Sequence, residues 1–228
     1  MTAYFITATG TDIGKTYVAA GLIRAFKQRG MAAQGLKPIV SGYTPETATA
    51  SDPGVLLAAM GEAVTEENIA RIAPWRFAAP LSPDMAATRE KRIIDFAQLI
   101  AFSRAAIAAD AGALLIEGVG GVMVPIGKPR TTLDWMLALN LPVIVVGGSY
   151  LGAISHMLTA VDVILRRNLR IGAVVINESA GSTVALDETA ATVKDYLAIS
   201  PASAAPLVTI HRNAEEKVFG ALADALTA

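Results

Sequence analysis

The sequence has 228 residues, enough for one large domain with a substantial buried core. Hydrophobic residues make up 53% and charged residues only 17%, so much of the surface must be uncharged and interfaces would cover part of it. The net charge of -1 disfavours nucleic-acid binding, and the lack of cysteine excludes disulfides, thiolate nucleophiles and cysteine-bound metals.

The first predicted elements are a strand over residues 4–7, a loop rich in glycine and threonine, and a helix that ends at Gly30. A helix start is expected at Asp52, and a long irregular connection is expected to run past Pro74, Pro80 and Pro83. Further along the chain, apolar runs predict strands at 113–116, 142–146 and 171–176, with helices over 95–109, 132–139, 153–167, 185–196 and 215–226.

Alternating strands and helices predict an α/β fold, doubly wound, with a mostly parallel sheet and helices on both faces. Neither a repeat nor a linker interrupts the pattern, so residues 1–228 are expected to form a single domain. The most apolar stretch, Leu141 to Ala153, is too short and too broken to span a membrane. Because no basic leader precedes the first strand, we expect a cytoplasmic protein.

The loop after the first strand carries the clearest motif, Ala8 to Thr16, which ends in the Gly-Lys-Thr triplet of a P-loop. Backbone N–H groups at the following helix can cradle phosphates, Lys15 can reach the β and γ phosphates, and the Thr16 hydroxyl can bind Mg²⁺. The strict pattern requires glycine where Thr9 stands. The alternative is a chance triplet at an ordinary helix start, but the strand–loop–helix context favours phosphate binding.

Two carboxylates are candidates for a metal or phosphate site. Glu117 ends a buried strand and precedes a glycine-rich turn, which suits Mg²⁺; a solvated turn is the competing interpretation. The local sequence around Asp52 favours a role as helix N-cap, either for Asp52 alone or shared with Ser51.

Three further features have weaker local signals. Lys37 precedes Pro38, which keeps its backbone extended, although a solvated lysine is the default for one position. The loop from Gly147 to Gly152 leads into a helix whose N–H groups could hold an anion, or else is a closely packed glycine turn. His156 in that helix is expected to be a core histidine rather than a base.

Taken together, these motifs resemble the dethiobiotin synthetases, P-loop ligases that use ATP and CO₂ to close a ureido ring on 7,8-diaminopelargonic acid. The resemblance spans most of the chain and is carried most specifically by Lys37-Pro38 with Ser41-Gly42, by Glu117-Gly118 with Gly120-Gly121, and by the P-loop. Further matching segments are 4–7, 51–52, 74–83, 134–135, 141–144, 151–156 and Asn177.

The resemblance implies a role for each matched residue. The residues expected to bind ATP are Asp12, Ile13, Gly14, Lys15, Thr16, Tyr17, Asp52, Glu117, Gly118, Val119, Gly120 and Asn177, the last as the adenine reader. The residues expected to bind the diamine substrate are Thr11, Lys37, Ser41, Ser149, Tyr150, Leu151, Gly152 and Ala153.

Catalysis would fall to Lys37 and Lys15, while Thr16, Asp52 and Glu117 would surround Mg²⁺. The implied partners are ATP, CO₂ or bicarbonate and the diamine, with the substrate carboxylate held by the loop from Gly148 to Ala153 across a homodimer interface. Neither a nucleic acid nor a membrane is expected as a partner.

Three departures from the family pattern stand out. Ala8 replaces the usual first glycine of the loop, and Asp12 replaces the commoner glutamate. The segment from Val208 to His211 replaces a glycine and a proline near the adenine, and no tyrosine lies near 187–189, where some members supply one from the partner chain.

Two other functions remain open on the sequence alone. One is a P-loop switch ATPase that acts through a protein partner, and the other is a nucleotide-binding module without turnover. A partition-type switch ATPase would be expected to carry a lysine at the start of its loop, where this chain has Gly10.

Overall fold

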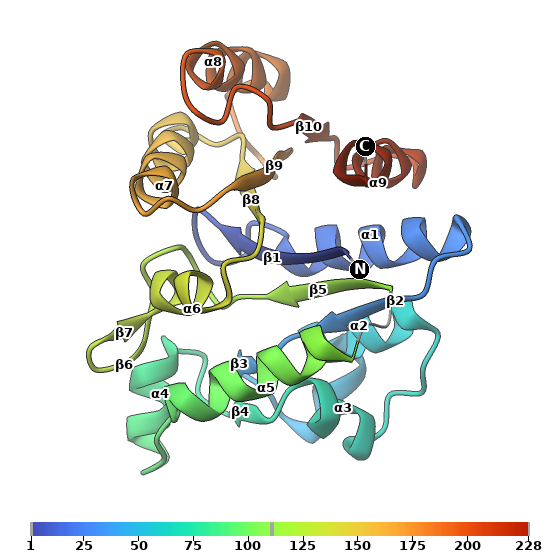
Figure 1. The fold of residues 1–228 in the computed structure, drawn as a ribbon, viewed down its shortest axis with the longest axis vertical. Helices are drawn as coiled ribbons and strands as arrows, with labels where there is room; N and C mark the ends of the chain where they lie inside the picture. Colours follow the sequence, from blue (N-terminus) through green and yellow to red (C-terminus); the bar gives the residue numbers. More distant parts are fainter. Residues whose placement is uncertain (1, 110–111, 228) are drawn as a thin grey trace.

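A computed structural model describes residues 2–109 and 112–227. Its largest sheet has six strands in the order β10-β9-β8-β1-β5-β2, and every pairing within it is parallel (Figure 1). The strands of this sheet are β1 (Thr2–Ala8), β2 (Ala33–Leu36), β5 (Ala113–Glu117), β8 (Val143–Gly148), β9 (Ile171–Asn177) and β10 (Leu207–Ile210). The predicted doubly wound, parallel α/β fold is therefore confirmed.

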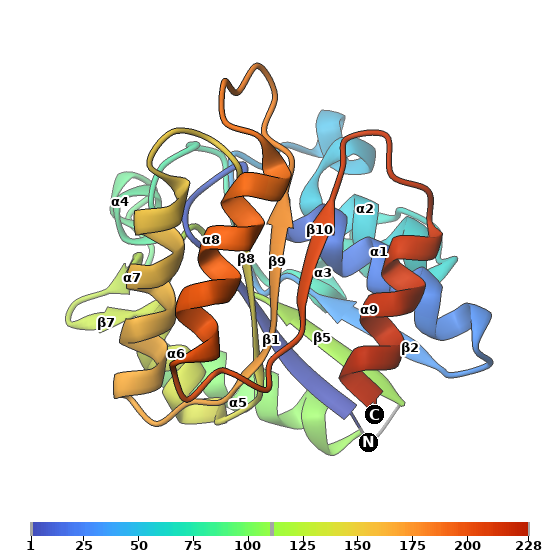
Figure 2. The same ribbon diagram turned by 90° about the horizontal axis from the view of Figure 1, so that it is seen from above.

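The helices flank both faces of the sheet, as Figures 1 and 2 show, with α6 and α7 on one side and α1 and α9 on the other. They are α1 (Lys15–Gln28), α2 (Asp52–Met60), α3 (Glu66–Ile72), α4 (Pro83–Arg89), α5 (Phe96–Ala108), α6 (Thr132–Leu139), α7 (Ala153–Arg166), α8 (Leu186–Ala198) and α9 (Lys217–Thr227). Helix α1 packs against α2 and α9, α5 packs against α6, and α7 packs against α8. None of the helices in the described part of the chain is long and apolar enough to cross a bilayer.

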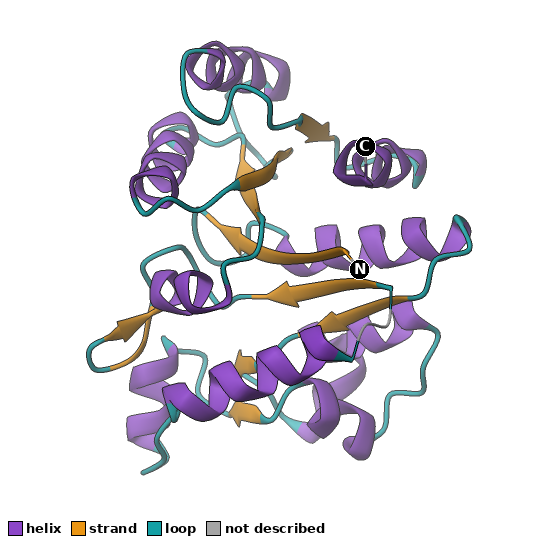
Figure 3. Ribbon diagram, viewed as in Figure 1, coloured by secondary structure: helices purple, strands orange, loops and turns teal. Residues whose placement is uncertain are grey.

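The sequence-based prediction is wrong for the connection between α2 and α5. Instead of an irregular segment it holds α3, a short strand β4 (Trp75–Phe77) and α4, and β4 pairs in parallel with β3 (Ile39–Ser41) as a separate two-stranded sheet (Figure 3). Two other short pieces are a 3₁₀ helix over Pro45–Ala50 and the antiparallel strands β6 (Pro125–Gly127) and β7 (Arg130–Thr131). These pieces are too short for a hydrophobic period to register.

The core extends to the turn that follows β5. Phe5 on β1 and Trp135 on α6 meet edge to face with ring centroids 4.9 Å apart, and both are fully buried. The same Phe5 ring closes on Gly118, where an added Cβ would lie 2.9 Å from a ring carbon. Glycine is therefore needed here, because any side chain would push the turn after β5 away from the core.

Candidate active site

The P-loop connects the carboxyl end of β1 to the first residue of α1. Asp12 and Gly14 both have positive φ, 56° and 93°, so the loop turns sharply before the helix begins at Lys15. No side chain caps this helix, which leaves its first N–H groups available for an anion. The Lys15 side chain is buried and folds back so that Nζ donates to the Gly10 carbonyl at 3.0 Å.

Beside the P-loop lies a cluster of buried charges built around Lys37. Its Nζ lies 2.5 Å from Glu117 Oε1 and 3.0 Å from Asp52 Oδ2, and it donates to the Gly118 carbonyl at 3.0 Å. The Thr16 hydroxyl donates to the same Glu117 oxygen at 2.8 Å. Lys37 is only 3% exposed and Glu117 only 1%, so the solvated-lysine and solvated-turn interpretations are both wrong.

This convergence follows from topology. Lys37 directly follows β2, Glu117 ends β5, and Thr16 lies in the first turn of the helix after β1, while β2 and β1 both pair with β5. The carboxyl ends of parallel strands meet at one edge of the sheet, so residues far apart in the chain are brought together there.

The charges in the cluster shift one another's ionisation. Burial alone would lower the pKa of Lys37, but Glu117 and Asp52 outweigh it and hold that pKa above its usual value. Burial would raise the pKa of Asp52, but Lys37 outweighs it and lowers that pKa. Burial, followed by the repulsion of Lys37, lowers the pKa of the Lys15 ammonium to about 8, against the attraction of Glu117. Near neutral pH both lysines and Asp52 are therefore mainly charged, whereas burial outweighs the attraction of Lys37 and raises the pKa of Glu117.

The donor set fits a magnesium ion. Glu117 Oε2 is buried without a hydrogen-bond partner, Asp52 Oδ2 and Glu117 Oε1 already contact one cation, the Lys37 ammonium, and the Thr16 hydroxyl donates to Glu117 Oε1 beside it. Among the described residues no three Asp, Glu or His side chains form a cage of their own. Mg²⁺ does not need one, because it usually keeps several waters and takes one or two carboxylates together with phosphate oxygens.

Asp52 does not cap its helix, contrary to the interpretation favoured by its local sequence. The N-cap of α2 is Ser51, whose hydroxyl accepts from the Gly54 N–H at 3.3 Å. The Asp52 carboxylate instead turns to Lys37. His156 also differs from expectation, because it is exposed on α7 and its Nδ1 lies 2.8 Å from the Tyr150 hydroxyl.

The P-loop and the Lys37 cluster open into a cleft of about 900 Å³, which is larger than the two other cavities, of about 380 and 250 Å³. Ten of the sequence-predicted site residues line it: Thr11, Asp12, Gly14, Lys15, Lys37, Ser41, Asp52, Glu117, Val119 and Gly120. The Ser41 hydroxyl is buried and has no hydrogen-bond partner. An unsatisfied hydroxyl at the wall of a cleft favours a polar ligand there.

The cleft is also lined by residues that sequence reasoning did not assign to the site. They are Val40, Gly42, Ala50, Ser51, Pro80, Leu81, Ser82, Pro83 and Val124. The signal that could have identified some of them is the pair Pro80 and Pro83, which lies within a segment that matches the resembled family. Its position over the cleft depends on the β3–β4 pairing, which the sequence did not reveal.

Asn177 ends β9 beside the P-loop, where its Nδ2 donates to the Ile13 carbonyl at 2.7 Å and its Oδ1 is buried without a partner. A Cβ on Gly14 would lie 2.4 Å from the same amide, so the loop and Asn177 fit closely. Ile210 on β10 pairs with Asn177, which places the segment 208–211 next to it. Tyr17 lies in the first turn of α1 and is 43% exposed. Its ring packs edge-to-face against Phe219 of α9.

The loop between β8 and α7, expected to hold the substrate carboxylate, does not line the large cleft. Ser149 is fully buried and exchanges two backbone-to-hydroxyl hydrogen bonds with Ser179, each 3.0 Å long. Leu151 is 85% exposed, and Gly152, with φ 96°, precedes Ala153 at the start of α7. A pocket of about 250 Å³ between the P-loop and α7 is lined by Ala8, Thr9 and Met123, with His156 at its α7 wall.

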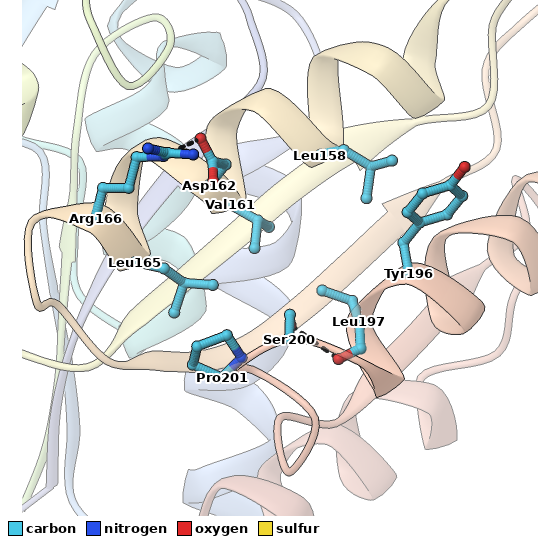
Figure 4. Close-up of a pocket in the computed structure, with 9 residues that line it drawn as sticks. All are labelled: Leu158, Val161, Asp162, Leu165, Arg166, Tyr196, Leu197, Ser200 and Pro201. Carbon is cyan, nitrogen blue, oxygen red and sulfur yellow. Dashed lines mark hydrogen bonds and ion pairs between the residues drawn. The ribbon is translucent and has the colours of Figure 1, made fainter.

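A third hollow lies between α7 and α8 and has a volume of about 380 Å³ (Figure 4). Its walls are mostly apolar, with Leu158, Leu165 and Tyr196 among them. At its rim, Arg166 Nε and Asp162 Oδ2 form an ion pair with each other at 2.7 Å. No buried unpaired polar group reaches it among the described residues, and it shares no residue with the large cleft.

Comparison with known proteins gives the chain clear relatives. A family model described as an AAA domain matches residues 2–222. The chain is 48% identical over 202 residues to the ATP-dependent dethiobiotin synthetase BioD of Acidiphilium cryptum (strain JF-5), covering 88% of this chain and 91% of that protein. It is 45% identical to the protein of the same name from Phenylobacterium zucineum (strain HLK1), covering 100% of this chain and 96% of that protein.

Solved structures of lower sequence similarity share the fold. The cell division ATPase MinD of Pyrococcus furiosus superposes with a TM-score of 0.57 at 15% identity, covering 100% of this chain and 99% of that one. The ParA protein of pNOB8 superposes with a TM-score of 0.56 at 11% identity, covering 99% and 97%. At such identities the likeness concerns the P-loop fold alone.

Proposed function

The chain belongs to the ATP-dependent dethiobiotin synthetase family, and we propose that it closes a ureido ring on 7,8-diaminopelargonic acid with CO₂ and ATP, through a carbamate and a carbamic-phosphoric anhydride. The observation that carries the proposal is the cleft in which the P-loop, two buried ammonium groups, two carboxylates and the unpartnered Ser41 hydroxyl meet. A site of this kind brings anions together rather than supplying a covalent nucleophile.

The nucleotide would lie along the P-loop. The free N–H groups at the start of α1 and the Lys15 ammonium favour the β and γ phosphates. The Asn177 Oδ1, buried and unpartnered, is placed to accept from an exocyclic amine such as that of adenine. Ile13, Gly14 and Tyr17 would surround the nucleotide on one side, with Gly118, Val119 and Gly120 on the other.

A magnesium ion bound by Thr16, Asp52 and Glu117 would neutralise phosphate charge and orient the γ-phosphate. Its binding is supported by two carboxylates that already contact one cation, the Lys37 ammonium, and by the Thr16 hydroxyl, which lies 2.8 Å from Glu117 Oε1.

The proposed reaction has three steps. One amine of the substrate adds to CO₂ and loses a proton, which gives a carbamate. A carbamate oxygen attacks the γ-phosphorus and displaces ADP, which gives the mixed anhydride. The second amine then attacks the carbonyl carbon and loses a proton, and phosphate leaves as the five-membered urea closes.

The residues act on the second step through charge and position. Bringing a carbamate to a triphosphate costs electrostatic repulsion, and the buried ammonium groups of Lys15 and Lys37 can offset it. Ser41, with Thr11 on the P-loop, lines the same cleft as Lys37 and can orient the carbamate.

The aliphatic tail of the substrate would extend from the cleft toward the loop of residues 149–153. The smaller pocket between Ala8, Thr9 and His156 supports that route, because it connects the P-loop to α7. The exposed N-terminus of α7 and the 85% exposed Leu151 support a site completed by a second copy of the chain, as a homodimer requires.

One assay tests the function. The protein is incubated with Mg-ATP, bicarbonate and the diamine, and ADP is measured together with the mass of the product. We expect ADP and a ring-closed product in equal amounts, no ADP when either the diamine or bicarbonate is omitted, and strongly reduced turnover in Lys15→Ala and Thr16→Ala. ATP hydrolysis that is independent of the diamine would instead favour a switch ATPase, and nucleotide binding without any turnover would favour a binding module.

A further inference from the structure

The Lys37 ammonium occupies the place of the cation in the proposed metal site. Its Nζ lies 2.5 Å from Glu117 Oε1 and 3.0 Å from Asp52 Oδ2, so one amino group touches both carboxylates assigned to the metal. The Thr16 hydroxyl, the third assigned ligand, donates to the same Glu117 oxygen. No other lysine among the described residues makes an ion pair with either carboxylate, and Lys15 donates to the Gly10 carbonyl instead.

We propose that Lys37 is the resident counter-ion of Asp52 and Glu117 in the metal-free protein and competes with the divalent cation for them, so that binding of the metal–nucleotide releases the Lys37 ammonium into the cleft. This inference rests on the proposed function, because it uses the metal site assigned there. It adds an order of events: the metal–nucleotide binds first, and the ammonium that is set free then binds an anionic carbamate.

Charge and geometry support the competition. A divalent cation and an ammonium cannot share Glu117 Oε1 at contact distance without strong mutual repulsion, which a buried site would screen poorly. Thr16 would also have to turn its lone pairs, rather than its proton, toward the metal. A metal ion bound at Glu117 Oε1 would therefore disrupt both contacts to this oxygen at once.

The Lys37 side chain has a destination when it leaves. Lys37 and Ser41 line the same cleft, and the buried Ser41 hydroxyl has no partner at present. A lysine has a flexible four-carbon stem and can move its ammonium by several ångströms without moving the backbone. The anchor that it would give up, besides the carboxylates, is a single hydrogen bond to the Gly118 carbonyl.

The test measures metal affinity rather than activity. Binding of Mn²⁺ is followed by electron paramagnetic resonance in the presence of saturating ADP, for the natural sequence, Lys37→Gln and Lys37→Met. We expect both replacements to bind Mn²⁺ at least about tenfold more tightly, because a competing positive charge has been removed. Lys194→Met, which removes an exposed lysine of α8, controls for the change in net charge and should leave the affinity unchanged.

One further variant, Glu117→Gln, separates the possible failures. Glu117→Gln should weaken Mn²⁺ binding severalfold or more; if it does not, the metal site of the proposed function is wrong, and this inference is overturned with it. If Glu117→Gln behaves as expected but Lys37→Gln binds Mn²⁺ no more tightly than the natural sequence, the metal site stands and the competition alone is wrong.

Stability provides a second measurement should either uncharged variant fold poorly. Thermal unfolding is compared with and without Mn²⁺ and ADP, since a ligand stabilises a protein more when it binds more tightly. We expect Lys37→Gln to gain more in Tm from the metal than the natural sequence gains. Lys37→Arg keeps the positive charge and should stay within about threefold of the natural Mn²⁺ affinity; an increase as large as that of Lys37→Gln would overturn the proposal.

Discussion

The Lys37 ammonium is assigned to offset the repulsion between carbamate and triphosphate. Its replacement should therefore affect the chemical step more than nucleotide binding. We predict that Lys37→Gln lowers kcat by about two to three powers of ten, equivalent to roughly 3–4 kcal/mol of transition-state stabilisation. Lys37→Arg should restore little, because a planar guanidinium cannot reproduce a compact ammonium between two anions. Single-turnover measurements with the diamine, bicarbonate and Mg-ATP isolate the step, and an unchanged rate in Lys37→Gln would contradict the assignment.

Asn177 should select the base of the nucleotide. Its Nδ2 is held by the Ile13 carbonyl, which leaves the buried Oδ1 as the acceptor for an exocyclic amine. We predict that Asn177→Ala raises the KM for ATP by about tenfold, the loss expected for one or two buried hydrogen bonds, while kcat changes little.

Inosine triphosphate, which lacks the amine, provides the control for this prediction. The natural sequence should prefer ATP to inosine triphosphate, and Asn177→Ala should lose most of that preference. Equal preference in the natural sequence would show that Asn177 does not read the base, and would point to the neighbouring segment 208–211 instead.

The local sequence revealed some of these residues and not others. The P-loop is contiguous, so its loop, lysine and threonine were visible as a motif with a strand before it and a helix after it. Lys37, Asp52 and Glu117 come from three separate segments: Lys37 and Glu117 meet because β2 and β5 are neighbours in the sheet, and Asp52 joins them from the start of α2. The local sequence favoured a solvated lysine at position 37 and a helix cap at Asp52. Only the family resemblance assigned all three residues to one site.

At the scale of the elements, the long buried strands and the long helices were predictable, and the short pieces were not. Helix α6 begins and ends where expected, at Thr132 and Leu139, because a capping threonine precedes it and an asparagine in the left-handed region follows it. Strand β10 has only four residues and follows a turn rich in alanine and serine. Strands β3 and β4 have three each and are defined by pairing with each other, which a local pattern does not reveal.

The start of α6 gives a stability prediction at this scale. Thr131 and Asp134 form a reciprocal capping box: the Asp134 carboxylate accepts from the Thr131 N–H at 2.8 Å, and the Thr131 hydroxyl accepts from the Asp134 N–H at 3.4 Å. We expect Asp134→Ala to lower the free energy of unfolding by about 1 kcal/mol. Asp162→Ala, which breaks an exposed ion pair on α7, is the control and should cost less than about 0.5 kcal/mol.

The same cap predicts a pH dependence. Burial would raise the pKa of Asp134, but hydrogen bonds from Thr131 outweigh it and hold that pKa below its usual value. A carboxyl with a lowered pKa in the folded state stabilises the fold above its unfolded pKa, and the contribution is lost as the pH falls through the folded-state pKa. The difference in stability between the natural sequence and Asp134→Ala should therefore shrink below about pH 4. A constant difference in urea unfolding from pH 7 to pH 3 would contradict this.

At the scale of the whole molecule, we predict that the active unit is a homodimer. The charged share is only 17%, and Leu151, Tyr196 and Ile199 are 85%, 57% and 86% exposed in the single chain. Light scattering should give twice the mass of one chain, and Leu151→Glu should weaken the dimer and raise the KM for the diamine together. A monomer with full activity would end this claim.

The order of strands has a consequence for how the chain is made. Strand β1 is synthesised early, but its two neighbours in the sheet are β5 and β8. Phe5 can therefore pair on both sides only after Ile116 and Val143 have been synthesised. Until then both edges of an apolar strand stay unpaired on the nascent chain, the situation in which strands aggregate and chaperones are needed. Ribosome-stalled chains should therefore show protease protection of β1 and the P-loop only after β8 has left the exit tunnel, so that the phosphate site forms late although its motif is translated first.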